Sequence, residues 1–222
     1  MTSLPASQQV AIDGPAGSGK SAVGRRVAAE LGLPFIDSGI LYRAVALVAL
    51  QRGTDTSTAK ADCLARLAER LRLELLPDRL AIDGLEVGPA LYTPDVSEAA
   101  SRVAEVPQVR AALLPQLRRL ARSGAVMAGR DIGTVVLPEA RHKFFLNASV
   151  EERVRRRQLQ QHGRGLRPDA AALRREIEDR DRRDRERSSS PLKVAHDAQA
   201  LNTDRLDLDQ VVSSILSSVR RS

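Results

Sequence analysis

The feature that most constrains this chain is a glycine-rich octapeptide near its N-terminus, Gly14-Pro15-Ala16-Gly17-Ser18-Gly19-Lys20-Ser21. It matches the G-x-x-x-x-G-K-[ST] phosphate-binding loop at every fixed position. Glycines let the backbone bend so that successive N–H groups point at phosphate oxygens, and the dipole of a following helix adds positive potential. In such a loop we expect Lys20 to reach the β- and γ-phosphates and the Ser21 hydroxyl to ligate Mg²⁺.

The residues on either side of the loop provide the context that the motif requires. Val10-Ala11-Ile12 is a short apolar run typical of a strand. After the loop, Val23, Val27 and Leu31 recur at helical spacing, and Gly32 follows as a C-cap. A strand, this loop and a helix in that order predict a site for a nucleoside triphosphate such as ATP.

The composition is that of a globular protein with one domain. The 222 residues are enough to bury a core. Of these residues 42% are apolar and only 2% are aromatic, so aliphatic side chains must build the core. The single cysteine, Cys63, excludes an intramolecular disulfide and suits a reducing compartment. Residues 1–9 lack the pattern of a signal peptide, and no apolar run is long enough to cross a bilayer, so we expect a cytoplasmic protein that has no membrane partner.

The formal net charge of +7 comes almost wholly from arginine, since only four of the 35 basic residues are lysines. Arginine offers a planar fork of donors that binds phosphate through two hydrogen bonds. A basic surface for nucleic acid and a cluster of arginines around small phosphorylated ligands are both compatible with this charge. Net charge does not distinguish these two kinds of site, whereas the positions of the arginines can distinguish them.

Four further segments have the character of strands in a parallel sheet. Each ends at a polar cluster, and helical patterns such as residues 109–122 and 149–161 separate them. This alternation predicts an α/β fold in which helices flank a parallel sheet and ligands bind at the carboxyl ends of the strands. The four segments are Pro34–Asp37, Ala125–Ala128, Lys143–Leu146 and Ala200–Asn202.

Residues 71–94 interrupt this rhythm. Apolar and polar residues alternate on both sides of Pro77-Asp78-Arg79. Alternation around a turn predicts a hairpin or a small antiparallel sheet, which we interpret as an insertion into the α/β core.

Two polar clusters follow predicted strands. In the first, Ser38 could cap a helix that carries Tyr42 one turn later and Arg43 beside a second anion, although a capped helix with a core tyrosine explains the same residues. In the second, Arg130 and Asp131 lie between glycines at the ligand-binding edge of the sheet. There the arginine could hold a phosphate and the aspartate could orient it; a purely structural ion pair is the alternative.

At this point the sequence resembles the bacterial cytidylate kinase family over nearly its whole length, from Val10 to about Val212. The Gly-Arg-Asp-Ile-Gly-Thr-Val-Val element at 129–136 discriminates far better than the phosphate loop, which many nucleotide-binding proteins share. The resemblance is carried by the phosphate loop, Asp37-Ser38-Gly39-x-x-Tyr42-Arg43, the 129–136 element, Glu151-Glu152-Arg153-x-x-Arg156-Arg157, Arg180-Asp181-x-x-Asp184-x-x-Arg187 and Pro191-Leu192.

The resemblance implies transfer of a phosphoryl group from Mg·ATP to CMP or dCMP. It implies a single P-loop kinase domain over residues 1–222, with a core of about 8–60 and 95–222. It further implies a substrate-side β insertion at about 66–94 and an arginine-rich lid at about 153–187. The insertion coincides with the hairpin that alternation predicts.

Family roles can be assigned to the matching residues. The resemblance gives residues 14–21, Arg153 and Arg157 to ATP, and gives Lys20, Arg130, Asp131 and Arg187 catalytic roles. It implies that Arg43 and Arg130 bind the acceptor phosphate, and that Ser101, Arg110 and Asp131 bind the cytosine ring. It also implies that Asp184 and Arg180 bind the sugar hydroxyls, and that Arg187 contacts the transferring phosphoryl group. Ser38 and Tyr42 would lie around the acceptor, and Ser21 would be the metal ligand, with Asp13 and Asp37 acting through water.

Three departures from the family pattern stand out: Ala128 in place of an acidic residue, Tyr92 in place of an arginine and Leu117 in place of a glutamine. We expect them to tune affinity or base choice without changing the reaction class. Many charges between Arg153 and Arg187 also suit a solvated helix with i,i+4 ion pairs such as Asp181–Arg185.

Alternatives of other classes remain. Another small-molecule P-loop kinase, acting on UMP, AMP or shikimate, shares the first strand, loop and helix. An arginine-rich RNA-binding NTPase would need interleaved aromatic residues for base stacking, which this chain lacks, so no nucleic-acid partner is expected. The histidines and Cys63 show no metal-site spacing, and nothing resembles a dimerisation zipper, so we expect a monomer.

Overall fold

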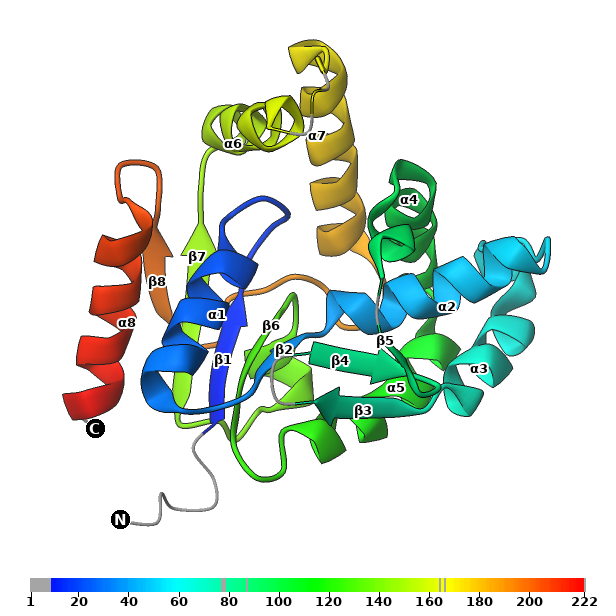
Figure 1. Cartoon of the computed structure of the whole chain (residues 1–222), viewed down its shortest axis with the longest axis horizontal. Helices are drawn as coiled ribbons and strands as arrows, with labels where there is room; N and C mark the ends of the chain where they lie inside the picture. Colours follow the sequence, from blue (N-terminus) through cyan, green and yellow to red (C-terminus); the bar gives the residue numbers. More distant parts are fainter. Residues whose placement is uncertain (1–8, 77–78, 87, 164, 166, 222) are drawn as a thin grey trace.

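The computed structural model describes residues 9–76, 79–86, 88–163, 165 and 167–221 (Figure 1). A parallel sheet forms its centre, and its five strands lie within one residue of the predicted ones. They are β1 (Gln9–Asp13), β2 (Phe35–Asp37), β6 (Ala125–Gly129), β7 (His142–Asn147) and β8 (Gln199–Asn202). Their order in the sheet is β2-β6-β1-β7-β8, so β1 lies at the centre.

The register of the sheet brings the two glycine-rich elements together. Asp13, the last residue of β1, pairs with Gly129, the last residue of β6. The chain places β2 and β6 on one side of β1, then crosses to β7 and β8 on the other side. Ligands of parallel sheets bind where strand order reverses in this way.

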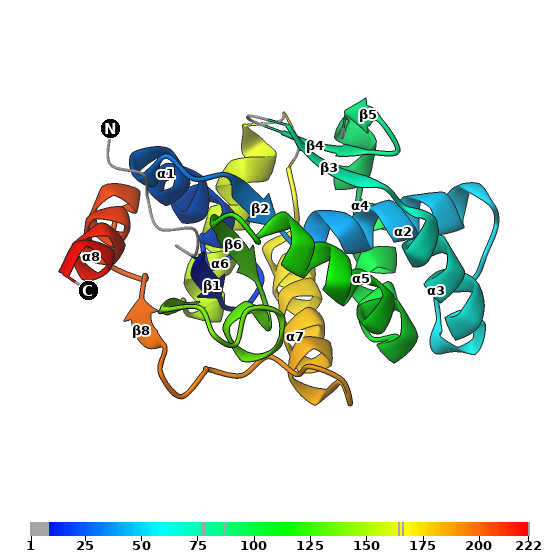
Figure 2. The same cartoon turned by 90° about the horizontal axis from the view of Figure 1, so that it is seen from below.

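Helices cover both faces of the sheet because its strands alternate their side chains between them. On one face, Val10 and Ile12 of β1 pack against α1 (Lys20–Leu31) and α8 (Leu208–Arg221), which lie side by side (Figures 1 and 2). On the other face, Ala11 belongs to a larger cluster built from α2 (Gly39–Gln51), α3 (Ala61–Arg70), α4 (Pro94–Val103) and α5 (Pro107–Leu120).

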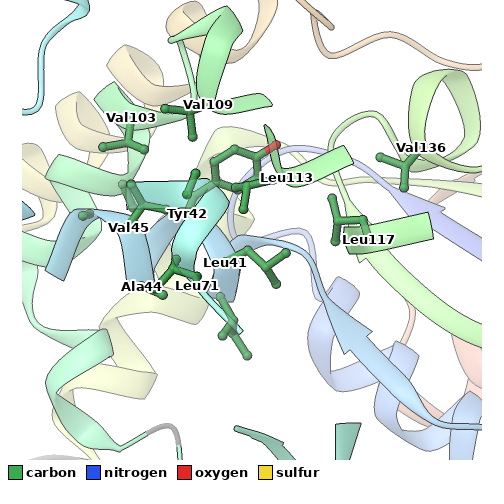
Figure 3. Close-up of a cluster of buried hydrophobic side chains, with 14 of the residues drawn as sticks. Leu41, Tyr42, Ala44, Val45, Leu71, Val103, Val109, Leu113, Leu117 and Val136 are labelled. Carbon is green, nitrogen blue, oxygen red and sulfur yellow. The ribbon is translucent and has the colours of Figure 1, made fainter. Parts of the chain in front are cut away.

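The larger cluster fixes the helix that carries two of the predicted site residues. Figure 3 shows the Tyr42 ring of α2 near Val109 and Leu113 of α5, and Val45 of α2 near Val103 of α4. Apolar residues occur almost all round α2, which suits a helix buried among α3, α4 and α5 rather than one lying on the surface.

The predicted β insertion is confirmed and has a third strand. β3 (Leu73–Leu76), β4 (Arg79–Ile82) and β5 (Leu85–Glu86) form an antiparallel sheet. Asp83 and Gly84, with φ of 53° and 74°, make the two-residue turn between β4 and β5, as the Asp-Gly pair favours. The predicted turn at Pro77-Asp78 lies outside the described residues.

The helices α6 (Val150–His162) and α7 (Ala170–Glu186) pack together above the carboxyl edge of the sheet (Figure 1). They share a small core of Val154, Leu173 and Ile177. Three single turns complete the described chain: η1 (Thr58–Lys60), η2 (Pro89–Tyr92) and η3 (Ile132–Val136). Within the ranges described above, no helix is both long and apolar enough to cross a membrane.

Candidate active site

One cleft gathers the predicted polar clusters. It has a volume of about 440 Å³ and lies at the carboxyl ends of β1, β2 and β6, beneath α6 and α7. Residues from the phosphate loop, from the segments predicted to bind the acceptor, and from α6 and α7 line it. The parallel sheet therefore brings together groups that are more than 150 residues apart in the chain.

The phosphate loop needs its glycines for backbone reasons. Gly14, Gly17 and Gly19 have φ of 147°, 78° and 93°, which L side chains rarely adopt. A Cβ at Gly14 would also collide with the carbonyl oxygen of Leu146 on β7. The loop ends at Lys20, the first residue of α1, so its N–H groups and the helix dipole face the same space.

Lys20 and Ser21 are held by polar partners of the protein itself. The Lys20 Nζ donates to the carbonyl of Pro15 at 2.6 Å, and burial, with help from nearby Arg130, lowers the pKa of Lys20 well below its ordinary value. The Ser21 hydroxyl donates to Asp37 Oδ2 at 2.8 Å. A hydroxyl beside a carboxylate is an oxygen donor set that fits Mg²⁺ when phosphates and water supply the other ligands.

Asp13 joins the central strand to the second glycine-rich element. Its two carboxylate oxygens accept from the backbone N–H groups of Ile132 at 2.8 Å and Gly133 at 2.7 Å. These bonds hold η3, a single π-turn in which Leu137 N–H donates to Ile132 O at 2.7 Å. π-turns are rare and occur often at functional sites. Burial raises the pKa of Asp13 to about 6, although the two backbone bonds oppose the rise.

Arg130 and Asp131 do not pair with each other, so the alternative of a structural ion pair between them is wrong. Arg130 Nε donates to Asp184 Oδ2 at 2.7 Å, whereas Asp131 pairs with Arg110. Asp131 is the residue just before η3, with φ of −143° and ψ of 27°. Arg187, the second cation near Asp131, lies 3.8 Å from Oδ1.

The wall of the cleft around Arg110 combines an ion pair with an aromatic ring. The Arg110–Asp131 pair is buried, with both side chains 7% exposed. The Arg110 guanidinium lies 5.3 Å from the centre of the Tyr42 ring. Tyr42 belongs to the core, as the alternative of a helix with a core tyrosine predicted, and it also lines the cleft. Nearby, the hydroxyl of Ser101 is buried without a hydrogen-bond partner among the described residues.

Ser38 does not cap α2 with its side chain, which is a correction to the prediction. It is the residue before the helix, but its hydroxyl donates to the carbonyl of Ala128 at 3.0 Å. Asp37 binds the first residue of the helix instead, because its Oδ1 accepts from Gly39 N–H at 3.0 Å. Ser38 therefore ties β2 to β6 at the floor of the cleft.

Arg43 projects from α2 toward η2. Its Nη1 donates to the carbonyl of Leu91 at 2.9 Å and to Ser97 Oγ at 2.7 Å. The Tyr92 ring lies 5.5 Å from the guanidinium carbon of Arg43 and is 44% exposed. The tyrosine that departs from the family pattern thus packs on a predicted phosphate-binding arginine.

Helix α7 contributes Arg180, Asp184 and, just after its last residue, Arg187. Burial opposes ionisation of Asp184, but Arg130 and Arg180 outweigh it and hold the Asp184 pKa below its ordinary value. Burial and the nearby Arg130 lower the pKa of Arg180 to about 10. The side chain of Arg187 is 2% exposed, and its Nη2 has no hydrogen-bond partner among the residues described.

Helix α6 contributes Arg153 and Arg157 to the cleft, as predicted, and places Arg156 beside them. Arg156 donates to the hydroxyl and carbonyl of Thr203 at 3.1 and 2.6 Å. Arg157 is 38% exposed and lies 3.9 Å from Glu176. The predicted Asp181–Arg185 pair is wrong, because Asp181 is buried against Arg153 at 2.6 Å. Sequence reasoning missed the roles of Arg156 and Asp181, which depend on how α6 and α7 pack.

The charge of the cleft distinguishes the two interpretations of the basic composition. Among the residues that the structure describes, nine cationic side chains line it and four carboxylates oppose them. The excess of five is most of the formal net charge of +7. Positive charge gathered in a concave site favours small anionic ligands over an extended polyanion. The nine are Lys20, Arg25, Arg43, Arg110, Arg130, Arg153, Arg157, Arg180 and Arg187.

Known proteins resemble the chain over nearly its full length. The cytidylate kinase of Exiguobacterium sibiricum is 47% identical over 212 residues, covering 93% of this chain and 94% of that protein. Cytidylate kinase 1 of Haemophilus influenzae is 41% identical, with 96% and 93% covered. A bifunctional pantoate ligase/cytidylate kinase of Synechococcus sp. is 44% identical over 99% of this chain, which spans 42% of that relative.

Structural and family comparisons agree with these relatives. An uncharacterized protein from Eubacterium ventriosum shares the fold, with a TM-score of 0.53 at 12% identity and 96% and 98% of the two chains covered. The family model described as cytidylate kinase matches residues 10–221. The chain belongs to the cytidylate kinase family.

Proposed function

We propose that this protein transfers the γ-phosphoryl group of Mg·ATP to CMP or dCMP, giving ADP and CDP or dCDP. One observation carries the proposal: a single cleft holds a phosphate loop at one end and a cluster of arginines paired with Asp131 and Asp184 at the other. Two anion sites that face each other suit a reaction between two phosphorylated substrates.

The donor end would hold ATP through the loop. Backbone N–H groups of residues 14–21 would bind the β-phosphate, and Lys20, once it leaves the Pro15 carbonyl, would reach the γ-phosphate. Arg157, with its half-exposed guanidinium, would approach the phosphates from the lid, while Arg153 borders the loop from behind. Mg²⁺ held by Ser21, with Asp37 acting through water, would neutralise charge on the phosphates.

The acceptor end offers groups that complement cytosine. The exocyclic amine of cytosine is a donor that needs an acceptor such as the Asp131 carboxylate, and its ring nitrogen and carbonyl need donors. Arg110 and the Ser101 hydroxyl, which has no hydrogen-bond partner within the described ranges, supply donors on the same wall. Tyr42 packs beside them and, with Ser38, shapes the floor of this end.

The remaining arginines would hold phosphate and sugar. Arg43 and Arg130 would bind the acceptor phosphate, and Asp184 with Arg180 would hold the sugar hydroxyls. Arg187 would act on the transferring phosphoryl group, because its Nη2 has no hydrogen-bond partner in the part of the chain that the structure describes. A buried donor without a partner is costly, and a ligand oxygen would satisfy it.

The mechanism follows from charge and positioning. Phosphoryl transfer needs two reactants held in line and positive charge on the oxygens of the moving group. Lys20, Arg130 and Arg187 all line the cleft and would supply this charge. The acceptor phosphate is already an anion, so no general base is required. The helices α6 and α7 above the cleft would exclude water, which would otherwise hydrolyse ATP.

The test is ADP formation from Mg·ATP with CMP, dCMP, UMP and AMP as separate acceptors. We expect strong turnover with CMP and dCMP, weak turnover with UMP and none with AMP. Ser101→Ala should raise the KM for CMP while leaving the KM for ATP unchanged, and Ser218→Ala on α8, far from the cleft, is the matched control. Turnover on AMP or shikimate instead would reassign the acceptor end, and no acceptor-dependent turnover would refute the proposal.

A further inference from the structure

Arg153 connects three separate parts of the chain. Its Nε donates to the carbonyl of Ala148 at 3.1 Å, its Nη1 to the phosphate-loop carbonyl of Ala16 at 3.1 Å, and its Nη2 to Asp181 Oδ2 at 2.6 Å. Its stem also lies under the loop, since a Cβ on Gly17 would be 3.3 Å from the Arg153 Cβ. The guanidinium therefore links the segment just after β7, the phosphate loop and α7.

The link between Arg153 and Asp181 is a buried ion pair. The two side chains are 4% and 6% exposed. Buried charges of this kind persist only when paired, so each residue depends on the other. Asp181 Oδ1 has no hydrogen-bond partner in the described part of the chain, so the carboxylate bonds only through Oδ2. A lysine could not replace Arg153, because only the planar fork can donate in three fixed directions.

Asp181 lies one turn from a residue that organises the acceptor end. Asp184 is three positions further along α7, accepts from Arg130 at 2.7 Å and lies 3.7 Å from Arg187. Because both aspartates belong to one continuous helix, the position of the phosphate loop and the position of the acceptor arginines are tied through α7.

We propose that the Arg153–Asp181 pair couples the two substrate sites, so that filling the phosphate loop strengthens binding at the acceptor end and the reverse. The inference rests on the proposed function. It gives Arg153 and Asp181 the role of positioning residues, which act through the loop and through α7 rather than on the reacting atoms. Contiguous contacts motivate this role, and only a measured coupling tests it.

The experiment measures the Kd of CMP by calorimetry, first with the protein alone and then with the protein saturated with Mg²⁺ and the non-hydrolysable analogue AMPPNP. The ratio of the two values is the coupling factor, which we expect to be at least fivefold in the unmodified protein. Asp181→Asn should reduce this factor toward one, while the Kd of CMP alone changes about twofold or less. Arg153→Lys should do the same, and it keeps the positive charge if Asp181→Asn fails to fold.

The chain offers a matched control. Arg174 of α7 and Glu151 of α6 form a second ion pair between these helices at 2.7 Å, with side chains 43% and 67% exposed. Glu151→Gln removes this surface pair and should leave the coupling factor unchanged. An unmodified protein with a factor of one, or variants that retain the full factor, would overturn the inference. If the unmodified protein binds no CMP under either condition, the proposed function fails instead.

Discussion

Asp13 is a carboxylate buried at the end of the central strand, and we expect its ionisation to govern how stability changes with pH. Burial, with a smaller contribution from nearby Asp131, raises its pKa from 3.8 to about 6, although the N–H groups of Gly133 and Ile132, together with Lys20, partly oppose the rise. At neutral pH the carboxylate is ionised and holds both N–H groups of η3.

The sign of the effect follows from the direction of the pKa change. A carboxyl group with a higher pKa in the folded chain binds its proton more tightly there. Its contribution to stability is therefore complete below pH 3.8 and is lost as the pH rises through about 6. At about 1.4 kcal/mol for each pKa unit, the full loss is about 3 kcal/mol, of which about 2 kcal/mol falls between pH 4.5 and 8.

Asp13→Asn tests this expectation because asparagine keeps the shape and never ionises. The free energy of unfolding is measured in urea from pH 4.5 to 8 for both proteins. The difference between them should move by about 2 kcal/mol in favour of the variant as the pH rises. Asp55→Asn is the control, since hydrogen bonds from Ser57 lower the Asp55 pKa and keep its titration acidic. A flat difference for Asp13→Asn would refute the reasoning.

Three further outcomes are expected. Tyr92→Ala removes the ring from Arg43, a contact worth about 0.5–1 kcal/mol at a half-exposed site, so the KM for CMP should rise about two- to fivefold. Tyr92→Phe keeps the ring and should keep the KM of the unmodified protein, so equal KM values in the two variants would contradict the expectation. Arg110→Met leaves Asp131, among the described residues, with only the more distant Arg187 as an ion-pair partner. Unfolding in urea should therefore show a loss of about 3 kcal/mol or more. EDTA should abolish turnover until Mg²⁺ is restored, and Ser21→Ala should raise the Mg²⁺ concentration required; turnover in EDTA would exclude the metal.

Local pattern was enough to predict the sheet and the position of the cleft. The five strands are short apolar runs with polar residues after them, and parallel pairing brings their carboxyl ends to one edge. The β insertion was predicted in the same way, because apolar and polar residues that alternate on both sides of a turn favour paired strands over other structures. The loop at residues 14–21 could be recognised without tertiary information, because its motif is local and three of its glycines have positive φ.

Side-chain partners could not be predicted from the sequence where tertiary packing chooses them. Helical spacing predicted an ion pair between Asp181 and Arg185, but the packing of α6 on α7 buries Asp181 against Arg153 instead. Adjacency suggested that Arg130 pairs with Asp131, yet the π-turn that directs them apart depends on Asp13, more than 100 residues earlier. No single-residue propensity encodes such a turn.

The central strand has a mechanical consequence for two phosphates that must react. Asp13 holds the backbone of the element that carries Asp131, and the next residue, Gly14, begins the loop proposed for ATP. A small thermal shift of β1 therefore carries both ends of the cleft in the same direction. We therefore expect the distance between the phosphate loop and Asp131 to vary less than the position of either one.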